Sequence, residues 1–101
     1  MESIKLSPTV KFGDIFAFFS YLSVYQSQYD KYTIRLYEKE GNSRKITCNF
    51  PALVKTLSVL DYNKYVDVYV FGYTKVTSSQ SVLLFDIIYD YISDSPIINL
   101  Y

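Results

Sequence analysis

Three aspartates have a spacing that could bring carboxylates together for chemistry. Asp86, Asp90 and Asp94 recur every four residues, so on a helix they would follow one ridge of its surface. Such a ridge could hold a hard cation such as Mg²⁺ or contact a basic partner. The simpler explanation is the solvated side of an apolar helix, because like charges at this spacing cost only about 0.2–0.5 kcal/mol per pair. We therefore assign no catalytic and no metal-binding residues.

The residues on which most enzymes rely are missing or isolated. The sequence contains no histidine, which excludes Ser-His-Asp and Cys-His mechanisms within this chain. Its single cysteine, Cys48, cannot form an intrachain disulfide or build a structural zinc site. Gly13, Gly41 and Gly72 stand alone, so there is no glycine-rich loop to bind phosphate. We expect a protein that is not an enzyme and that uses no cofactor.

The second candidate site is the polar side of a predicted β-hairpin at residues 31–50. Cations, a ring and hydroxyl groups on a sheet can bind single-stranded nucleic acid through phosphate contacts and base stacking. The candidate contacts are Arg35, Tyr37 and Lys45, and an ordinary solvated surface or a protein contact remains an alternative. If the strands pair in register, the polar side consists of Thr33, Arg35, Tyr37, Lys45, Thr47 and Asn49. The carboxylates that would oppose binding are those of Asp30, Glu38 and Glu40.

Tyrosine is unusually frequent, with 12 residues in a chain of 101. A buried tyrosine needs a partner for its hydroxyl group, so a chain of this size is not expected to bury all of them. Tyrosine is enriched where proteins meet, because one end of its side chain is apolar and the other polar. We therefore predict an interface with a second copy, as a homodimer, or with another macromolecule. Its candidate residues are Phe18, Tyr21, Tyr25, Tyr29, Tyr89 and Tyr91.

The first half of the chain predicts a strand, a helix, the hairpin and a second helix. Residues 2–6 end in an alternating pattern, and Ser7-Pro8 offers a helix start. Apolar residues three and four apart then predict a helix from about residue 8 or 12 to residue 28. Alternating runs on either side of Gly41-Asn42 predict the hairpin. Pro51 begins a helix that ends near residues 61–63.

The second half predicts a strand, a third helix and a last strand. Residues 65–71 place Val66, Val68 and Val70 on one face of a strand, with residues 75–77 as a possible extension. The apolar stretch 82–92 fits a helix or a buried strand, and the spacing of the aspartates favours a helix over residues 82–94. Residues 97–101 predict the last strand. The expected fold class is α+β, an antiparallel sheet with helices packed on one face, in the order β-α-β-β-α-β-α-β.

Length, charge and hydropathy limit the class of protein. A chain of 101 residues, half of them apolar, is expected to form a single globular domain over residues 1–101. Ten basic and ten acidic residues give a formal net charge of zero, so attraction to nucleic acid or to an anionic membrane would have to be local. No stretch reaches the roughly 18 apolar residues of a membrane span. We expect a soluble, intracellular protein without a membrane partner.

The composition and one segment carry a resemblance to viral proteins. The chain is rich in Tyr, Ile, Ser and Phe, poor in Gly and Ala, and contains SVLLFDIIYDYISDSP at residues 81–96. It resembles small proteins of the rod-shaped and filamentous viruses of hyperthermophilic archaea. Within that group it is most similar to a family of unknown function that includes inhibitors of host type III CRISPR effector complexes. The resemblance implies a non-catalytic protein that acts in the host cytoplasm on a host protein or ribonucleoprotein, and it transfers no functional residue.

Overall fold

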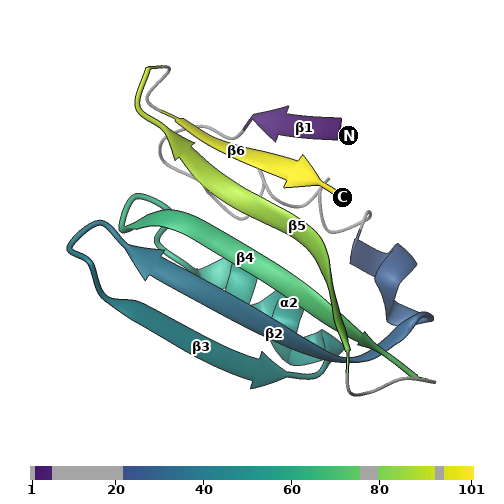
Figure 1. The fold of residues 1–101 in the computed structure, drawn as a ribbon. Coiled ribbons are helices and arrows are strands. Elements are labelled where there is room, and N and C mark those ends of the chain that lie inside the picture. Colours follow the sequence, from purple (N-terminus) through teal and green to yellow (C-terminus); the bar gives the residue numbers. More distant parts are fainter. Residues whose placement is uncertain (1, 6–21, 76–79, 93–94) are drawn as a thin grey trace.

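The computed structural model describes residues 2–5, 22–75, 80–92 and 95–101 of the chain. They form an antiparallel sheet of six strands in the order β1-β6-β5-β4-β2-β3 (Figure 1). One helix, α2, connects β3 to β4, and residues 22–26 are helical. The expected α+β class with an antiparallel sheet is therefore confirmed. The elements are β1 (Glu2–Lys5), β2 (Tyr29–Glu38), β3 (Ser43–Cys48), α2 (Phe50–Val59), β4 (Tyr65–Thr74), β5 (Ser81–Asp90) and β6 (Ser95–Leu100).

The predicted hairpin is confirmed as β2 and β3. Their register places Arg35 directly opposite Lys45. The turn is closed by a hydrogen bond of 2.7 Å from the amide of Glu38 to the carbonyl of Asn42. Gly41 has a φ of 87°, a left-handed conformation that glycine adopts without a steric penalty because it lacks a Cβ. The turn residues therefore fix the register, and the register fixes which side chains share a face.

The second predicted helix is confirmed as α2. The side chain of Asn49 caps its start by accepting a hydrogen bond of 3.0 Å from the amide of Ala52. Near its other end, the hydroxyl of Tyr62 donates a hydrogen bond of 2.7 Å to the carbonyl of Leu57. This carbonyl belongs to the last turn, where carbonyl groups have no partner within the helix. Both ends of α2 thus obtain hydrogen-bond partners from side chains next to them in the sequence.

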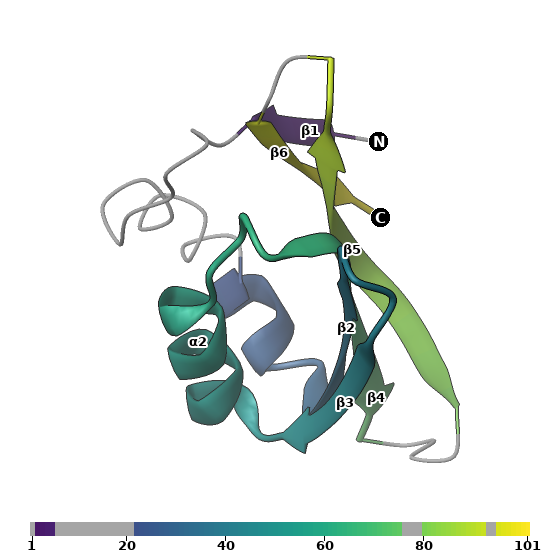
Figure 2. The same cartoon turned by 90° about the vertical axis from the view of Figure 1, so that its left-hand side faces the viewer.

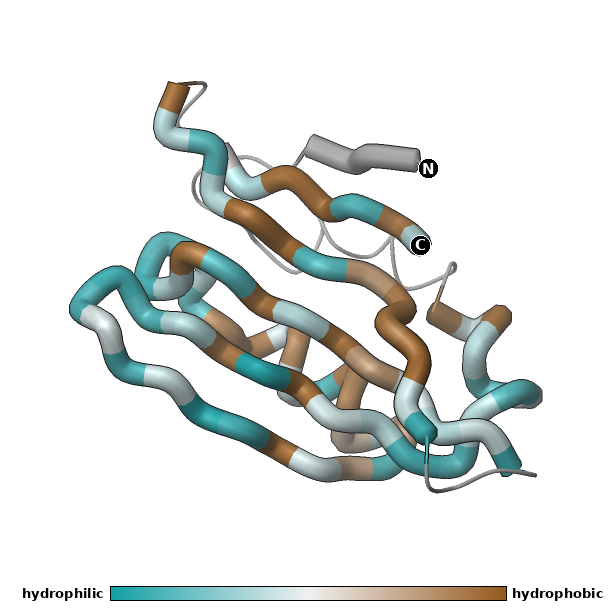
Figure 3. The backbone as a smooth tube through the Cα atoms, in the orientation of Figure 1, coloured by the Kyte–Doolittle hydropathy of each residue, from teal (hydrophilic) through white to brown (hydrophobic). Residues whose placement is uncertain are grey.

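The hydrophobic core lies between the sheet and the helical segments. Figure 2 shows α2 and residues 22–26 on the same side of the sheet. Apolar and polar residues alternate along much of β2 and β4 (Figure 3), so that one face of each of these strands points into this core. Its buried members are Leu22, Tyr32, Ile34, Leu36, Leu53, Leu57, Tyr62, Tyr65, Val68, Val70, Leu84, Phe85, Ile87 and Ile98.

The third predicted helix, over residues 82–94, is wrong. Ser81–Asp90 form strand β5, which pairs with β4 on one side and with β6 on the other. The described elements after α2 are therefore three strands, where the sequence predicted strand, helix and strand. The strand predicted at residues 65–71 is confirmed and extends to Thr74 as β4, and the last predicted strand is confirmed as β6.

An irregularity in the sheet explains this error. The register between β4 and β5 shifts between Val70 and Phe71, which gives β5 one extra residue at that point. Leu84 and Phe85 are consequently both buried, and the strict alternation of a strand is lost. Asp86 is also buried, so it does not mark a solvated side. The four-residue spacing of the aspartates imitates the period of a helix by coincidence.

The first predicted helix lies largely outside the described residues. Residues 22–26 are helical, and Leu22 is fully buried in the core. This segment ends before Tyr29, where β2 begins. The first predicted strand corresponds to β1, which pairs with β6. Within the described part of the chain, no helix has the length and apolar character needed to cross a membrane.

We expect Gly72→Ala to lower the free energy of unfolding by about 1–3 kcal/mol, the usual cost of overpacking. An added Cβ would lie 2.7 Å from Cδ1 of Tyr29 and 3.0 Å from Cδ1 of Leu84. These atoms belong to packed side chains, so the Tyr29 ring would have to move. Urea unfolding followed by circular dichroism measures the loss.

The same substitution in a Tyr29→Ala background provides the control. Without the ring, only the 3.0 Å contact with Leu84 remains, and the cost of the alanine should fall by more than about 0.5 kcal/mol, the lower range of coupling between contacting residues. Equal costs in the two backgrounds would show that the Tyr29 ring does not limit this position.

Candidate nucleic-acid interface

The side of the sheet opposite α2 carries rings and charged groups, and we call it the open face. Residues two apart on a strand point to the same side, so alternate residues of three neighbouring strands form this surface. Figure 2 shows both described helical segments on the other side of the sheet. The members of the open face are Lys31, Thr33, Arg35 and Tyr37 of β2, Lys45 and Thr47 of β3, and Asp67, Tyr69, Phe71 and Tyr73 of β4.

The structure brings the three predicted nucleic-acid contacts together. Arg35 and Lys45 form a direct cross-strand pair, and Tyr37 follows two residues after Arg35 on the same side of β2. Asn49, which was also expected on this side, lies beyond the end of β3 and caps α2. The open face therefore contains the predicted contacts, together with four residues of β4.

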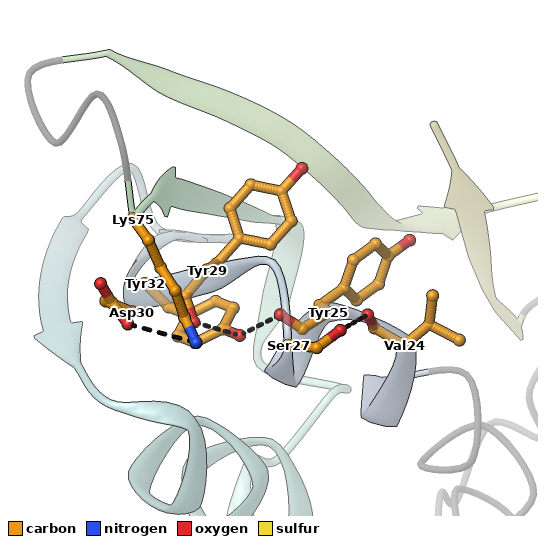
Figure 4. Close-up of polar contacts among 7 residues, drawn as sticks. All are labelled: Val24, Tyr25, Ser27, Tyr29, Asp30, Tyr32 and Lys75. Carbon is orange, nitrogen blue, oxygen red and sulfur yellow. Dashed lines mark hydrogen bonds and ion pairs between the residues drawn. The ribbon is translucent and has the colours of Figure 1, made fainter.

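Two of the carboxylates expected to oppose binding have basic neighbours. Oε1 of Glu38 lies 3.4 Å from Nζ of Lys64. Oδ1 of Asp30 lies 3.9 Å from Nζ of Lys75 (Figure 4). Both lysines are about half exposed, so these pairs contribute little to stability. They do, however, offset negative charge beside the open face.

The pairing of β2 with β4 sets cations against aromatic rings. The guanidinium carbon of Arg35 lies 5.1 Å from the ring centre of Phe71. Nζ of Lys31 lies 5.5 Å from the ring centre of Tyr73. Such contacts are favourable because the face of an aromatic ring carries partial negative charge. These contacts hold the basic side chains against the sheet. A ligand on the open face would therefore meet aromatic rings and positive charges together.

A shallow depression of about 380 Å³ lies in the middle of the open face. In its lining, the rings of Tyr37 and Tyr69 meet edge to face, with their centres 5.7 Å apart. Leu83 of β5 adds an aliphatic wall. The depression therefore combines flat apolar surfaces with two charged groups. Its lining residues are Arg35, Tyr37, Asp67, Tyr69, Phe71 and Leu83.

The two charged groups of the depression have no polar partner in the described part of the chain. Neither Arg35 nor Asp67 makes a hydrogen bond or an ion pair to a described residue. Burial raises the pKa of Asp67, and the nearby carboxylate of Asp86 raises it further. A donor and an acceptor are thus left available at the surface of the depression.

The aspartates predicted to form a ridge do not act together. Asp86 is 2% exposed and accepts hydrogen bonds from Nδ2 of Asn99 at 2.8 Å and from the hydroxyl of Tyr101 at 2.6 Å. Asp90 accepts a hydrogen bond of 3.0 Å from the amide of Ile92, and Asp94 lies outside the described residues. Among the described residues, no three His, Cys, Asp or Glu side chains are grouped so as to hold a metal ion.

Part of the predicted protein interface contributes to the interior of the chain. Phe18 and Tyr21 lie outside the described residues. Tyr25 and Tyr29 pack against the core, with ring centres 6.0 Å apart. The hydroxyl of Tyr32 donates a hydrogen bond of 3.0 Å to the carbonyl of Tyr25 (Figure 4). Burial raises the pKa of Tyr32 to about 12, so this hydroxyl keeps its proton at neutral pH.

The other predicted interface residues lie at the end of β5, Tyr89 within the strand and Tyr91 directly after it. The rings of Tyr89 and Tyr91 meet edge to face at 4.9 Å, and Nζ of Lys39 lies 4.0 Å from the ring centre of Tyr89. Tyr91 is 65% exposed and Ile92 is 99% exposed. A second depression, of about 430 Å³, lies here. We call its apolar lining the tip patch: Ile88, Tyr89, Tyr91, Ile92 and Ile97.

Sequence reasoning missed the contribution of β4 to the open face. The sequence assigns the valines of this strand to one side, and Val68 and Val70 are indeed buried. The same alternation places Asp67, Tyr69 and Phe71 on the opposite side. The signal was therefore present in the sequence. Alternation alone does not show that β4 lies next to β2, and this pairing brings the rings to the cations.

We expect Asp67→Asn to stabilise the fold at neutral pH. Because the pKa of Asp67 is raised in the folded state, its ionised form destabilises the fold above that pKa. The penalty disappears below the ordinary aspartate value of 3.8. Thermal unfolding between about pH 3 and pH 8 should show the variant gaining on the wild type as the pH rises. An Asp67→Asn protein less stable than the wild type at neutral pH would contradict this reading of the site.

No known protein family, curated protein or solved structure matches this chain. The functional interpretation therefore depends on the chemistry of the open face and of the tip patch.

Proposed function

We propose that the protein is a non-catalytic binding protein whose open face holds single-stranded nucleic acid. One observation carries the proposal: basic residues of β2 lie beside aromatic rings of β4, on a face that no described helix covers. Phe71 and Tyr73 lie beneath basic side chains, and Tyr37 and Tyr69 form a ring pair beside them. Binding of this kind needs a surface and no reacting group.

Single strands suit this surface better than a duplex does. Unpaired bases can stack on aromatic rings and on guanidinium planes, whereas a base inside a duplex offers only its edge. Stacking contributes about 1–3 kcal/mol per base and tolerates any sequence. A broad sheet face cannot enter a duplex groove, which admits an α-helix or a two-stranded ribbon. The open face is thus suited to bases that have left the helical stack.

The local charge of the open face also favours binding of a nucleic-acid strand, although the formal net charge of the whole chain is zero. Lys31, Arg35 and Lys45 lie on the open face, and lysine and arginine neutralise phosphates by releasing condensed counterions. Asp67 is the one carboxylate among the members of the open face. Asp86 of β5, which lies opposite Tyr69 of β4 and is 2% exposed, accepts two hydrogen bonds. The positive groups therefore lie mainly over β2 and β3.

Fluorescence anisotropy with labelled single strands of about 12 nucleotides, a typical site size, tests the proposal. We expect Phe71→Ala to weaken binding roughly 5- to 150-fold, the equivalent of one lost stacking contact. With three phosphate contacts, the logarithm of the affinity should fall with that of the salt concentration at a slope of about −2.

Tyr91→Ala is the matched control, because Tyr91 is an exposed ring outside the open face. It should bind the strands like the wild type. Thermal unfolding of both variants separates a lost contact from a lost fold. Failure of the wild type to bind any single strand at low salt would refute the proposal, since phosphate contacts are strongest there.

A second candidate function is a protein contact through the tip patch. The observation that favours it is the exposure of Tyr91 and Ile92 beside a depression with apolar walls. Contiguous exposed apolar side chains with a polar rim are typical of interaction sites. The resemblance to archaeal viral proteins suggests a host partner in the cytoplasm, specifically a type III CRISPR effector complex. A second copy of this chain is the alternative occupant.

We expect Ile92→Asp to abolish inhibition of target-RNA cleavage by a purified type III effector complex. The charge would have to be buried in the contact, which is costly without a partner. Val59→Asp is the control, since Val59 is 73% exposed at the end of α2 and is not part of the tip patch. Native mass spectrometry of the free protein, whose chain mass is 11.8 kDa, reports a homodimer. Equal inhibition by the wild type and Ile92→Asp would exclude the tip patch as the contact.

A further inference from the structure

The depression on the open face has the size and lining of a site for one planar group. Its volume of about 380 Å³ falls at the lower end of the range for small-ligand pockets, about 300–1,000 Å³. Rings of Tyr37, Tyr69 and Phe71 and the side chain of Leu83 provide its apolar surface. Such a lining fits a single nucleobase. The inference that follows rests on the proposed binding of single strands and concerns which base is recognised.

The depression has two charged groups of opposite sign, the guanidinium of Arg35 and the carboxylate of Asp67, which do not contact each other. Arg35 lies opposite Tyr69, and Asp67 lies opposite Tyr37, so the two charged residues are diagonal neighbours across β2 and β4. The Cα atoms of diagonal neighbours are about 7–8 Å apart, and no ion pair joins the side chains of Arg35 and Asp67. A flat ligand between them would meet a fork of donors on one side and an acceptor-only carboxylate on the other.

Among the four common bases, guanine matches this pair of groups. Its Watson–Crick edge has two adjacent N–H donors, N1–H and N2–H, which a carboxylate can accept as a pair. Its O6 and N7 are the acceptors to which arginine donates most often. Adenine and cytosine place an acceptor beside their amino group, which would face the carboxylate lone pairs. Uracil has one N–H between two carbonyl groups, so it offers the carboxylate a single hydrogen bond.

We infer that the depression between Arg35 and Asp67 is a guanine-binding pocket, in which Asp67 accepts from N1–H and N2–H and Arg35 donates to O6 or N7. The rings then hold the base by stacking, and the neighbouring cations hold the phosphates. The raised pKa of Asp67 is consistent with this role, because a partly buried carboxylate without a donor is held at a cost. Two N–H donors from a ligand would remove that cost.

Competition with uridine 12-mers tests the pocket, one strand being all uridine and the others carrying a single central guanosine, adenosine, cytidine or inosine. We expect the guanosine strand to bind roughly 5- to 150-fold more tightly than the adenosine and cytidine strands, the discrimination of one bidentate contact. Inosine lacks only the N2 amino group, so it should lose most of this gain. Asp67→Asn should abolish the preference for the guanosine strand, so that this strand binds the variant no more tightly than the adenosine and cytidine strands do.

Asp30→Asn is the matched control, since Asp30 is an exposed aspartate paired with Lys75 outside the pocket, and it should keep the preference. Equal binding of all strands by the wild type would overturn the guanine pocket and leave single-strand binding intact. Binding of 5′-GMP without binding of any strand would support the pocket and overturn the proposed function. Binding of neither would overturn both.

Discussion

The pairing of β2 with β4 is the constraint on which the rest of the structure depends. It extends along the length of both strands and places Ile34 opposite Val70 on the core side and Arg35 opposite Tyr69 on the other. A shift by one residue would turn every side chain of a strand to the opposite face. The burial of the valines therefore also orders the open face. The core beneath α2 and the candidate site above it are two sides of the same register.

Sequence predicted the elements whose signals are local. The hairpin follows from two alternating runs and a Gly-Asn turn, and α2 follows from Asn49, Pro51 and its apolar stripe. The prediction for residues 81–90 failed because the features that make this segment a strand lie in other parts of the chain. The shift opposite Val70 and the burial of Asp86 depend on β4 and β6, which the residues of β5 do not specify. An interior strand buried on both faces loses its alternation and resembles a buried helix.

The residues of the candidate site also fall into those that the sequence could place together and those that only the structure adds. The sequence could place Arg35, Tyr37 and Lys45 together, because a hairpin brings its own two strands side by side. It could not add the rings of β4, since β4 is separated from β2 by α2 and loops, and strand order is not encoded in alternation. The tyrosine excess was a correct sign of rings beyond the core: Tyr37 and Tyr91 are exposed, whereas Tyr32 and Tyr62 are buried. Their distribution between two surfaces required the structure.

Asp67 is the residue by which the open face differs from a surface built only for charge. A carboxylate among cations weakens attraction to phosphate, and its partial burial disfavours the charged form. A surface that served only to hold a polyanion would gain from a neutral residue at this position. The carboxylate has a use if Asp67 contacts a base while the cations contact the phosphates of the nucleic-acid backbone. Contacts to bases distinguish one sequence from another, whereas contacts to phosphates set the position of the strand on the protein. The charge that costs stability in the free protein would then be the one that discriminates between ligands.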